Sequence, residues 1–196
     1  ASDVYKRQDG DVAYIQDKGT LIVGITEFEP MDYKAEGSDE WIGFDADMAK
    51  AFAESLGVDV EFQEITWDYK VEELDSKAID CVWNGMTLGE DVMAAMGTSV
   101  PYCTNAQVLV VPADKAADFE GLTSLEGLNV AVESGSAGED AAIALGATTV
   151  PVQSQANTLM EVSAGTSDAA VIDLLMAGAM IGEGTSYEDL TFTLNL

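Results

Sequence analysis

The sequence predicts an α/β fold in which parallel-rich sheets are flanked by helices. Two observations predict this class: short apolar runs of strand type alternate with helix-type segments, and the alternation begins again after residue 111. Repeated strand–helix units bring parallel strands together and place helices on both faces of the sheet. The restart predicts two similar lobes, at 11–105 and 112–196, joined by a crossover hinge at 106–111. Residues 1–10 do not continue the pattern and are interpreted as a leader or a cloning remnant.

The first half supplies its elements in regular alternation. A helix is predicted over 45–56 because Met48, Phe52 and Leu56 recur every four residues and Gly57 follows as a stop. The apolar run 21–25 is typical of a buried strand. In order, the expected elements are strand 21–25, helix 45–56, strand 58–65, helix 69–76 capped by Asp68, strand 79–84, helix 90–96 and strand 106–111.

The second half repeats the alternation. The expected elements are strand 128–133, a Ser-Gly-rich turn at 134–138, helix 139–145, strand 148–152, helix 156–164, strand 168–172 and helix 174–182. Ligands of such sheets bind at the carboxyl ends of the strands, so these ends are where a site is sought.

Composition excludes several classes of function. The chain has 196 residues, with 8 Lys+Arg against 36 Asp+Glu and a formal net charge of −28. This charge excludes a nucleic-acid partner and electrostatic docking on anionic lipid. The chain has no His, which removes imidazole-based catalysis and the commonest metal ligand. We expect no metal and no cofactor.

Cys81 lies in an apolar run and is expected to be a buried free thiol, with a disulfide to Cys103 as the alternative.

Candidate binding residues follow the strands. They are Phe28 after 21–25, Trp67 after 58–65, Asn84, Gly85, Met86 and Thr87 at the end of 79–84, Ser134, Ser136 and Ala137 after 128–133, and Asp173 after 168–172. Each also has a plainer interpretation. The aromatic residues would be ordinary core, the Gly-x-Thr and Ser-Gly segments would be ordinary turns, and Asp173 would be the N-cap of helix 174–182.

Six segments in order resemble one family. These segments are GTLIVGITEFEPMDY, WIGFDADMAKAFAESLGV, AIDCVWNGMTL, the PY-TNAQVLVV crossover, LNVAVESGSAG and SDAAVID. The chain from about Asp11 to Leu196 is similar to the bacterial extracellular solute-binding proteins of polar amino-acid ABC transporters, family 3. The resemblance implies a two-lobed type II periplasmic-binding-protein fold whose lobes close on a free amino acid.

The resemblance also implies roles for the candidate residues. Phe28 and Trp67 match positions that sandwich the ligand side chain, and rigid aromatic rings suit such walls. Gly85 and Thr87 match positions that meet the ligand's amino and carboxylate groups. The N–H groups at the start of helix 139–145 form an anion site, with Ser136 and the Ala137 amide as carboxylate donors. Asp173 matches the family's residue that holds the ligand ammonium. Its apolar neighbours in the sequence agree with this role, since a carboxylate in such surroundings needs a partner.

Three departures from the family bear on the ligand. Val92 stands where the family has an arginine that holds the ligand carboxylate, and Arg7, the only arginine, lies outside the lobes. The aspartate–aromatic pair that precedes the crossover is replaced by Gly97-Thr98. Family members continue for a few dozen residues past this chain's last position, so the first lobe is expected to be incomplete. These departures favour weak binding of amino acids, or an amine that lacks a carboxylate.

The expected function is capture of a small ammonium-bearing solute, foremost an amino acid, for delivery to the membrane permease of an ABC transporter. The expected location is periplasmic or extracellular, with a membrane anchor in the full-length precursor. Two alternatives stay open: a periplasmic dehydratase similar to cyclohexadienyl dehydratase, with Glu27 or Glu133 as a catalytic acid of raised pKa, and a truncated module with weak or no binding. Uncovered apolar surface on an incomplete lobe predicts a homodimer.

Overall fold

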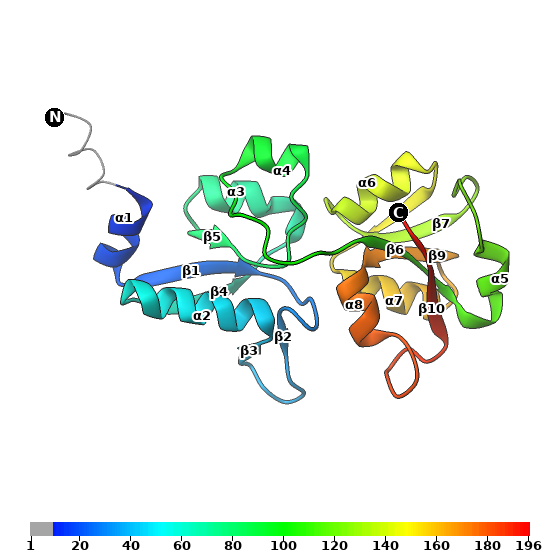
Figure 1. Ribbon diagram of the computed structural model, residues 1–196, viewed down its shortest axis with the longest axis horizontal. Coiled ribbons are helices and arrows are strands. Elements are labelled where there is room, and N and C mark those ends of the chain that lie inside the picture. The colour runs from blue at the N-terminus through cyan, green and yellow to red at the C-terminus, as the bar shows by residue number, and fades with distance from the viewer. Residues whose placement is uncertain (1–9) are drawn as a thin grey trace. The chain divides into compact units, whose positions relative to one another are not determined.

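The computed structural model describes residues 10–196, whose elements follow one another as in Figure 1. Contacts among these residues divide the chain into two compact units. Unit 1 comprises the described residues up to Thr26, together with Met31–Ile65 and Tyr69–Asn84. Unit 2 comprises Glu27–Pro30, Thr66–Asp68 and Gly85–Leu196. Apart from Gly10, the segment expected to be a leader lies outside the described residues.

Unit 1 is built on a three-stranded parallel sheet in the order β4-β1-β5. β1 (Thr20–Ile25) pairs with β4 (Asp59–Glu64) along its whole length, whereas β5 (Cys81–Val82) meets β1 over only two residues. The strand expected over 79–84 is therefore much shorter than predicted. The other elements are α1 (Asp11–Lys18), the hairpin of β2 (Tyr33–Lys34) and β3 (Trp41–Ile42), α2 (Phe44–Leu56), and α3 (Lys70–Asp75), which follows the 3-10 helix η2 (Trp67–Tyr69).

Helix α2 is present as predicted, but a different face is buried. Ala46, Ala49 and Ala53 point inward and are at most 1% exposed, because small side chains let the helix approach the sheet closely. Met48 and Phe52, whose spacing predicted the helix, are 41% and 42% exposed. The Phe52 ring lies 5.7 Å from the Trp83 ring at the end of β5. The periodicity predicted the helix correctly but not its orientation.

Two aspartates are fully buried where the loop after β1 meets the start of α2. Asp32 and Asp45 are both 0% exposed, and the Asp45 N–H donates to the Met31 carbonyl at 2.9 Å. Within the described part of the chain, neither carboxylate oxygen of Asp32 has a hydrogen-bond partner. Burial, together with the nearby Asp45 carboxylate, raises the pKa of Asp32 to about 9. Asp32 is therefore protonated at neutral pH.

Unit 2 contains a five-stranded sheet in the order β10-β6-β9-β7-β8. β7 (Asn129–Glu133) is parallel to β8 (Thr148–Val152) and to β9 (Ala169–Asp173), as repeated strand–helix units predict. β6 (Gln107–Pro112) runs antiparallel to both β9 and β10 (Leu190–Asn195), and β10 was not predicted. The sheet is therefore mixed. The antiparallel register of β6 and β9 sets Gln107 opposite Asp173.

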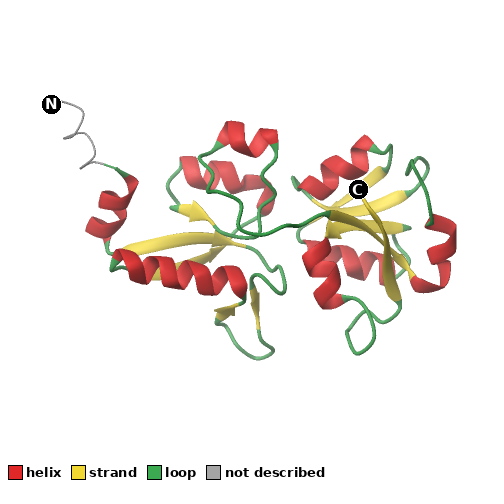
Figure 2. Cartoon of the chain, in the orientation of Figure 1, coloured by secondary structure: helices red, strands yellow, loops and turns green. Residues whose placement is uncertain are grey.

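Helices cover both faces of this sheet. α6 (Ala137–Ala144) lies on one face and α7 (Gln155–Ser163) on the other (Figure 1), while all five residues of β9 between them are buried. The helices of unit 2 are α4 (Glu90–Ala95), the 3-10 helix η3 (Ala113–Lys115), α5 (Ala116–Phe119), α6 (Ala137–Ala144), α7 (Gln155–Ser163) and α8 (Leu174–Met180). Residues 96–106, between α4 and β6, form neither helix nor strand (Figure 2). Within residues 10–196, no helix has the length and apolar character that crossing a membrane requires.

Candidate ligand-binding site

Asp173 is the last residue of β9 and lies at the carboxyl end of the strand, where ligands of such sheets bind. Its side chain is 5% exposed. Three side-chain amides donate to its carboxylate: Gln107 to Oδ1 at 2.9 Å, Asn105 also to Oδ1, and Gln155 to Oδ2. Gln155 also accepts from the Asp173 N–H at 2.9 Å, so this amide contacts both the side chain and the backbone.

The amides fix the orientation of a carboxylate without neutralising it. Burial raises the pKa of Asp173, and the hydrogen bonds from Gln155, Gln107 and Asn105 offset only part of this rise. Hydrogen bonds to a charged group contribute roughly 1.5–3 kcal/mol each. Asp173 occupies the N-cap position of α8, but its side chain makes no cap hydrogen bond. The capping interpretation is therefore wrong for the side chain.

The turn after β7 begins α6 with a reciprocal cap. Ser136 is the N-cap residue, and its Oγ accepts from the Glu139 N–H at 3.1 Å. The Glu139 carboxylate folds back and accepts from the Gly135 N–H at 2.8 Å. This pattern is close to a capping box, in which a side chain at each end of the first turn satisfies a backbone N–H. One N–H of the expected anion site is therefore already bonded to a carboxylate of the chain.

A second carboxylate lies over the same turn. The Ser134 Oγ donates to Asp68 Oδ2 at 3.3 Å. A Cβ placed on Gly135, whose φ is +70°, would lie 2.5 Å from Asp68 Oδ1 and 3.0 Å from the Asp68 Cα, so only glycine fits here. The prediction that Asp68 caps the following helix is wrong, since α3 begins at Lys70 with Tyr69 at the N-cap and no side-chain cap.

The aromatic candidates are both buried. Phe28 is 2% exposed and Trp67 is 7% exposed. The Phe28 ring packs against Gly85, whose φ is +57°, so closely that a Cβ on Gly85 would lie 2.9 Å from Phe28 Cδ1 and nearer still to Cε1. Gly85 therefore meets the Phe28 ring directly.

We expect Gly85→Ala to destabilise unit 2 and to weaken ligand binding. A non-glycine residue in the left-handed region costs about 1–3 kcal/mol, and the added methyl group must displace the Phe28 ring. Thermal unfolding and ligand titration measure the two effects. Gly97→Ala is the matched control, because no atom lies within 4 Å of a Cβ at that position. Equal melting temperatures for the two variants would contradict the Phe28 contact.

The remaining predicted residues differ in their surroundings. Asn84 belongs to unit 1. Its side-chain amide accepts from the Thr26 N–H at 2.8 Å and donates to the Thr26 Oγ1 at 2.5 Å. These two hydrogen bonds connect the end of β5 to the end of β1. Met86 is half-buried and Thr87 is exposed. Val92, where the family's arginine is expected, is an apolar side chain of α4 only 8% exposed. Whether Met86 and Thr87 contact a ligand stays a prediction.

Sequence reasoning missed the side chains that surround the candidates. Asn105, Gln107 and Gln155 around Asp173 are neutral amides far from it in sequence, and no local pattern marks them. Glu139 did have a signal, since Ser136-x-x-Glu139 has the spacing of a capping box.

Among residues 10–196, no three Cys, Asp or Glu side chains gather as metal ligands would. Both cysteines are free thiols, Cys81 being half-buried and Cys103 exposed.

Comparison with known proteins identifies the family. The sequence matches the family described as bacterial extracellular solute-binding proteins, family 3, over residues 21–178. The chain belongs to this family.

Individual relatives agree with this assignment. The chain is 30% identical over 165 residues to the arginine-binding extracellular protein ArtP of Bacillus subtilis, covering 82% of this chain and 63% of that protein. A crystal structure of a mutant of ArgBP from T. maritima superposes with a TM-score of 0.85 at 30% identity, covering 95% of this chain and 81% of the other. Cyclohexadienyl dehydratase of Pseudomonas aeruginosa is 24% identical over 127 residues, covering 64% of this chain and 47% of the enzyme. The chain therefore spans less than two thirds of the length of these curated relatives.

Proposed function

We propose that this chain is the substrate-binding component of an amino-acid ABC uptake system and that Asp173 binds the ammonium group of a small solute. The observation that carries the proposal is the buried carboxylate held by Asn105, Gln107 and Gln155 at the end of β9. Neutral donors orient the carboxylate without adding a positive charge, so its negative charge is available to bind a cation. Charge-assisted hydrogen bonds are roughly twice as strong as neutral ones. The relative ArtP is described as an arginine-binding protein, and arginine has an ammonium group. This similarity supports a ligand with an ammonium group.

Partners and location follow from the same proposal. A membrane permease of an ABC transporter would receive the solute, at the extracellular or periplasmic location that the family name implies. An anchor in the full-length precursor would hold the protein at the membrane. The exposed stripe of Phe44, Met48 and Phe52 along α2 supports self-association as a homodimer, whose test is the mass in solution over a wide range of concentration.

Thermal shift with a panel of amino acids and polyamines tests the binding role. A ligand that binds only the folded state stabilises it by about 2.7 kcal/mol at a concentration one hundred times its Kd. We expect at least one ammonium-bearing compound to raise the melting temperature, and matched compounds without an ammonium group to have no effect. No shift with any compound, in a protein whose circular dichroism is that of a folded chain, would contradict the role.

A dehydratase is the second candidate, favoured by one observation. Glu133 ends β7 and is 3% exposed, which is the buried position at a strand end that such an acid would need. Glu27, the other acid considered for this role, is exposed and does not meet that condition. Incubation with arogenate or prephenate distinguishes the candidates, because turnover of either compound would favour the enzyme.

A further inference from the structure

Asp173 is the N-cap residue of α8, yet its carboxylate does not cap the helix. Its backbone has the extended conformation of an N-cap residue, with φ of −67° and ψ of 137°, and its side chain makes no cap hydrogen bond. An aspartate at this position ordinarily accepts from the second or third N–H of the helix. The carboxylate is therefore directed away from a role that its backbone would allow.

The start of α8 is capped instead by the segment that precedes β6. The Leu175 N–H donates to Asn105 Oδ1 at 3.3 Å, and the Leu174 N–H donates to the Ala106 carbonyl at 2.8 Å. These are the first two N–H groups of α8, which begins at Leu174. Asn105 therefore supplies the acceptor that the side chain of an N-cap aspartate normally provides.

Asn105 also contacts the carboxylate itself. Its Nδ2 donates to Asp173 Oδ1, so a single amide joins the carboxylate to the start of α8. Gln107 donates to the same oxygen at 2.9 Å, whereas Gln155 donates to Oδ2. Of these three donors, Asn105 is the one that also accepts from an N–H of α8.

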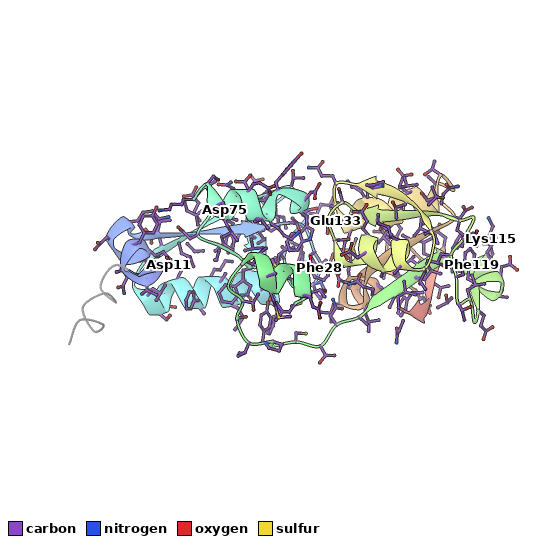
Figure 3. The ribbon with its side chains drawn as sticks, turned by 90° about the horizontal axis from the view of Figure 1, so that it is seen from above. Asp11, Phe28, Asp75, Lys115, Phe119 and Glu133 are labelled. Carbon is purple, nitrogen blue, oxygen red and sulfur yellow. The ribbon has the colours of Figure 1, made fainter. Side chains whose placement is uncertain are left out.

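These contacts lie at one edge of the unit 2 sheet. The parallel strands β7 and β9 end there, at Glu133 and Asp173, and the antiparallel strand β6 begins there. Lys115 and Phe119, which follow the far end of β6, are well separated from Glu133 in Figure 3. Asn105 is therefore placed where the carboxyl ends of the parallel strands meet, which is where ligands of such sheets bind.

We infer that Asn105 is a positioning residue of the ligand site: by capping α8 in place of Asp173, it keeps the Asp173 carboxylate available to a cation. The inference rests on the proposed function, because it takes Asp173 as the ammonium site. Without the Asn105 side chain, the Leu175 N–H loses its acceptor, which is unfavourable for a partly buried donor. Asp173 Oδ1 then accepts from that N–H, and the negative charge is directed to the helix N-terminus instead of the ligand.

Asn105→Ala tests this exchange of caps, with L-arginine and cadaverine as the probes. We expect binding of the probe that the wild type binds to weaken by at least about tenfold, while the melting temperature stays close to that of the wild type because Asp173 replaces the lost cap. Asn129→Ala is the matched control. The Asn129 amide donates to the exposed Asp168 carboxylate at the other end of β9, so its loss should leave the affinity unchanged.

Two results would overturn the inference. Unchanged affinity in a folded Asn105→Ala would show that Asp173 binds the probe without help from Asn105, and the proposed function would stand. An unfolded Asn105→Ala would show that Asp173 cannot take over the cap of α8.

Asn105→Asp is the conservative variant that should rescue binding. Aspartate has the length of asparagine and an oxygen that accepts from the Leu175 N–H, so α8 stays capped and Asp173 stays free of that role. We expect this variant to bind the same probe several-fold more tightly than Asn105→Ala does. An equal loss of affinity in the two variants would overturn the exchange of caps.

A measurement without ligand separates this inference from the proposed function. The carbon-13 shift of the Asp173 carboxyl carbon, followed with pH, gives the pKa of that group. In Asn105→Ala the pKa should fall, because the carboxylate exchanges an amide donor for a backbone N–H at a helix N-terminus, where negative charge is favoured. A rise would mean that a donor was lost and no cap was gained, which would overturn the inference. A fall, with neither probe binding the wild type, would contradict the proposed function and leave the exchange of caps standing.

Discussion

Asp173→Asn should weaken binding of an ammonium-bearing ligand by roughly 10- to 100-fold, because a hydrogen bond to a charged group contributes about 1.5–3 kcal/mol. It should also destabilise unit 2. The wild-type carboxylate accepts from three amide donors, and asparagine would turn its own NH2 group toward one of them. An unsatisfied buried donor costs about 1–3 kcal/mol, so the melting temperature should fall by several degrees.

The matched control lies at the start of the same strand. Asp168, just before β9, is exposed and accepts from the Asn129 N–H at 2.9 Å. Asp168→Asn removes the same charge and one hydrogen-bond acceptor, yet should leave the Kd unchanged. Isothermal titration of both variants with the best ligand measures the difference. Equal affinities for the wild type and Asp173→Asn would remove Asp173 from the binding site.

The stability of Asp32→Asn relative to that of the wild type should increase as the pH rises. The pKa of Asp32 is about 9 in the folded chain and near 3.8 when solvated, so the folded state holds a proton that the unfolded state releases between these values. Stability contributed by this group is complete below about pH 4 and is lost as the pH rises toward 9, by about 1.4 kcal/mol for each unit of pH. Asparagine has no proton to lose and avoids this loss.

Thermal unfolding of both proteins from pH 5 to pH 8.5 measures the effect. The difference in melting temperature between Asp32→Asn and the wild type should grow steadily across this range. Glu36→Gln, in an exposed position four residues further along the chain, should show a constant and small difference. A constant difference for Asp32→Asn as well would mean that Asp32 is not protonated in the folded protein.

Local signals in the sequence predicted the elements but not how they pack. Helix α2 followed from the spacing of Met48 and Phe52, yet the sheet is covered by Ala46, Ala49 and Ala53, because close packing selected the small residues. β5 forms a ladder of two residues although its apolar run is longer. The antiparallel pairing of β6 depends on contacts with β9, more than sixty residues away, and no local pattern specifies a partner at that distance.

The candidate site was predictable to a similar extent. Asp173 stood out because it is the one acid in an otherwise apolar run, and burial of such a residue demands partners. The partners themselves were not predictable, since Asn105, Gln107 and Gln155 are the kind of neutral residue that occurs throughout a surface. The Ser136 and Ala137 region was correctly recognised as a helix start. The side chains that contact this turn include Asp68, which is distant in the sequence and bonds to Ser134, so no local pattern could reveal it.

The contrast between the two thiols makes the protein suitable for site-selective labelling as it stands. Burial and the neighbouring Asp80 raise the pKa of the Cys81 thiol to about 12, so almost none of it is thiolate at neutral pH. Cys103 is exposed in the irregular segment 96–106, two residues before Asn105. A maleimide dye would therefore attach at Cys103 alone, next to a donor of the Asp173 carboxylate. Its fluorescence would report occupancy of the site without any engineered cysteine.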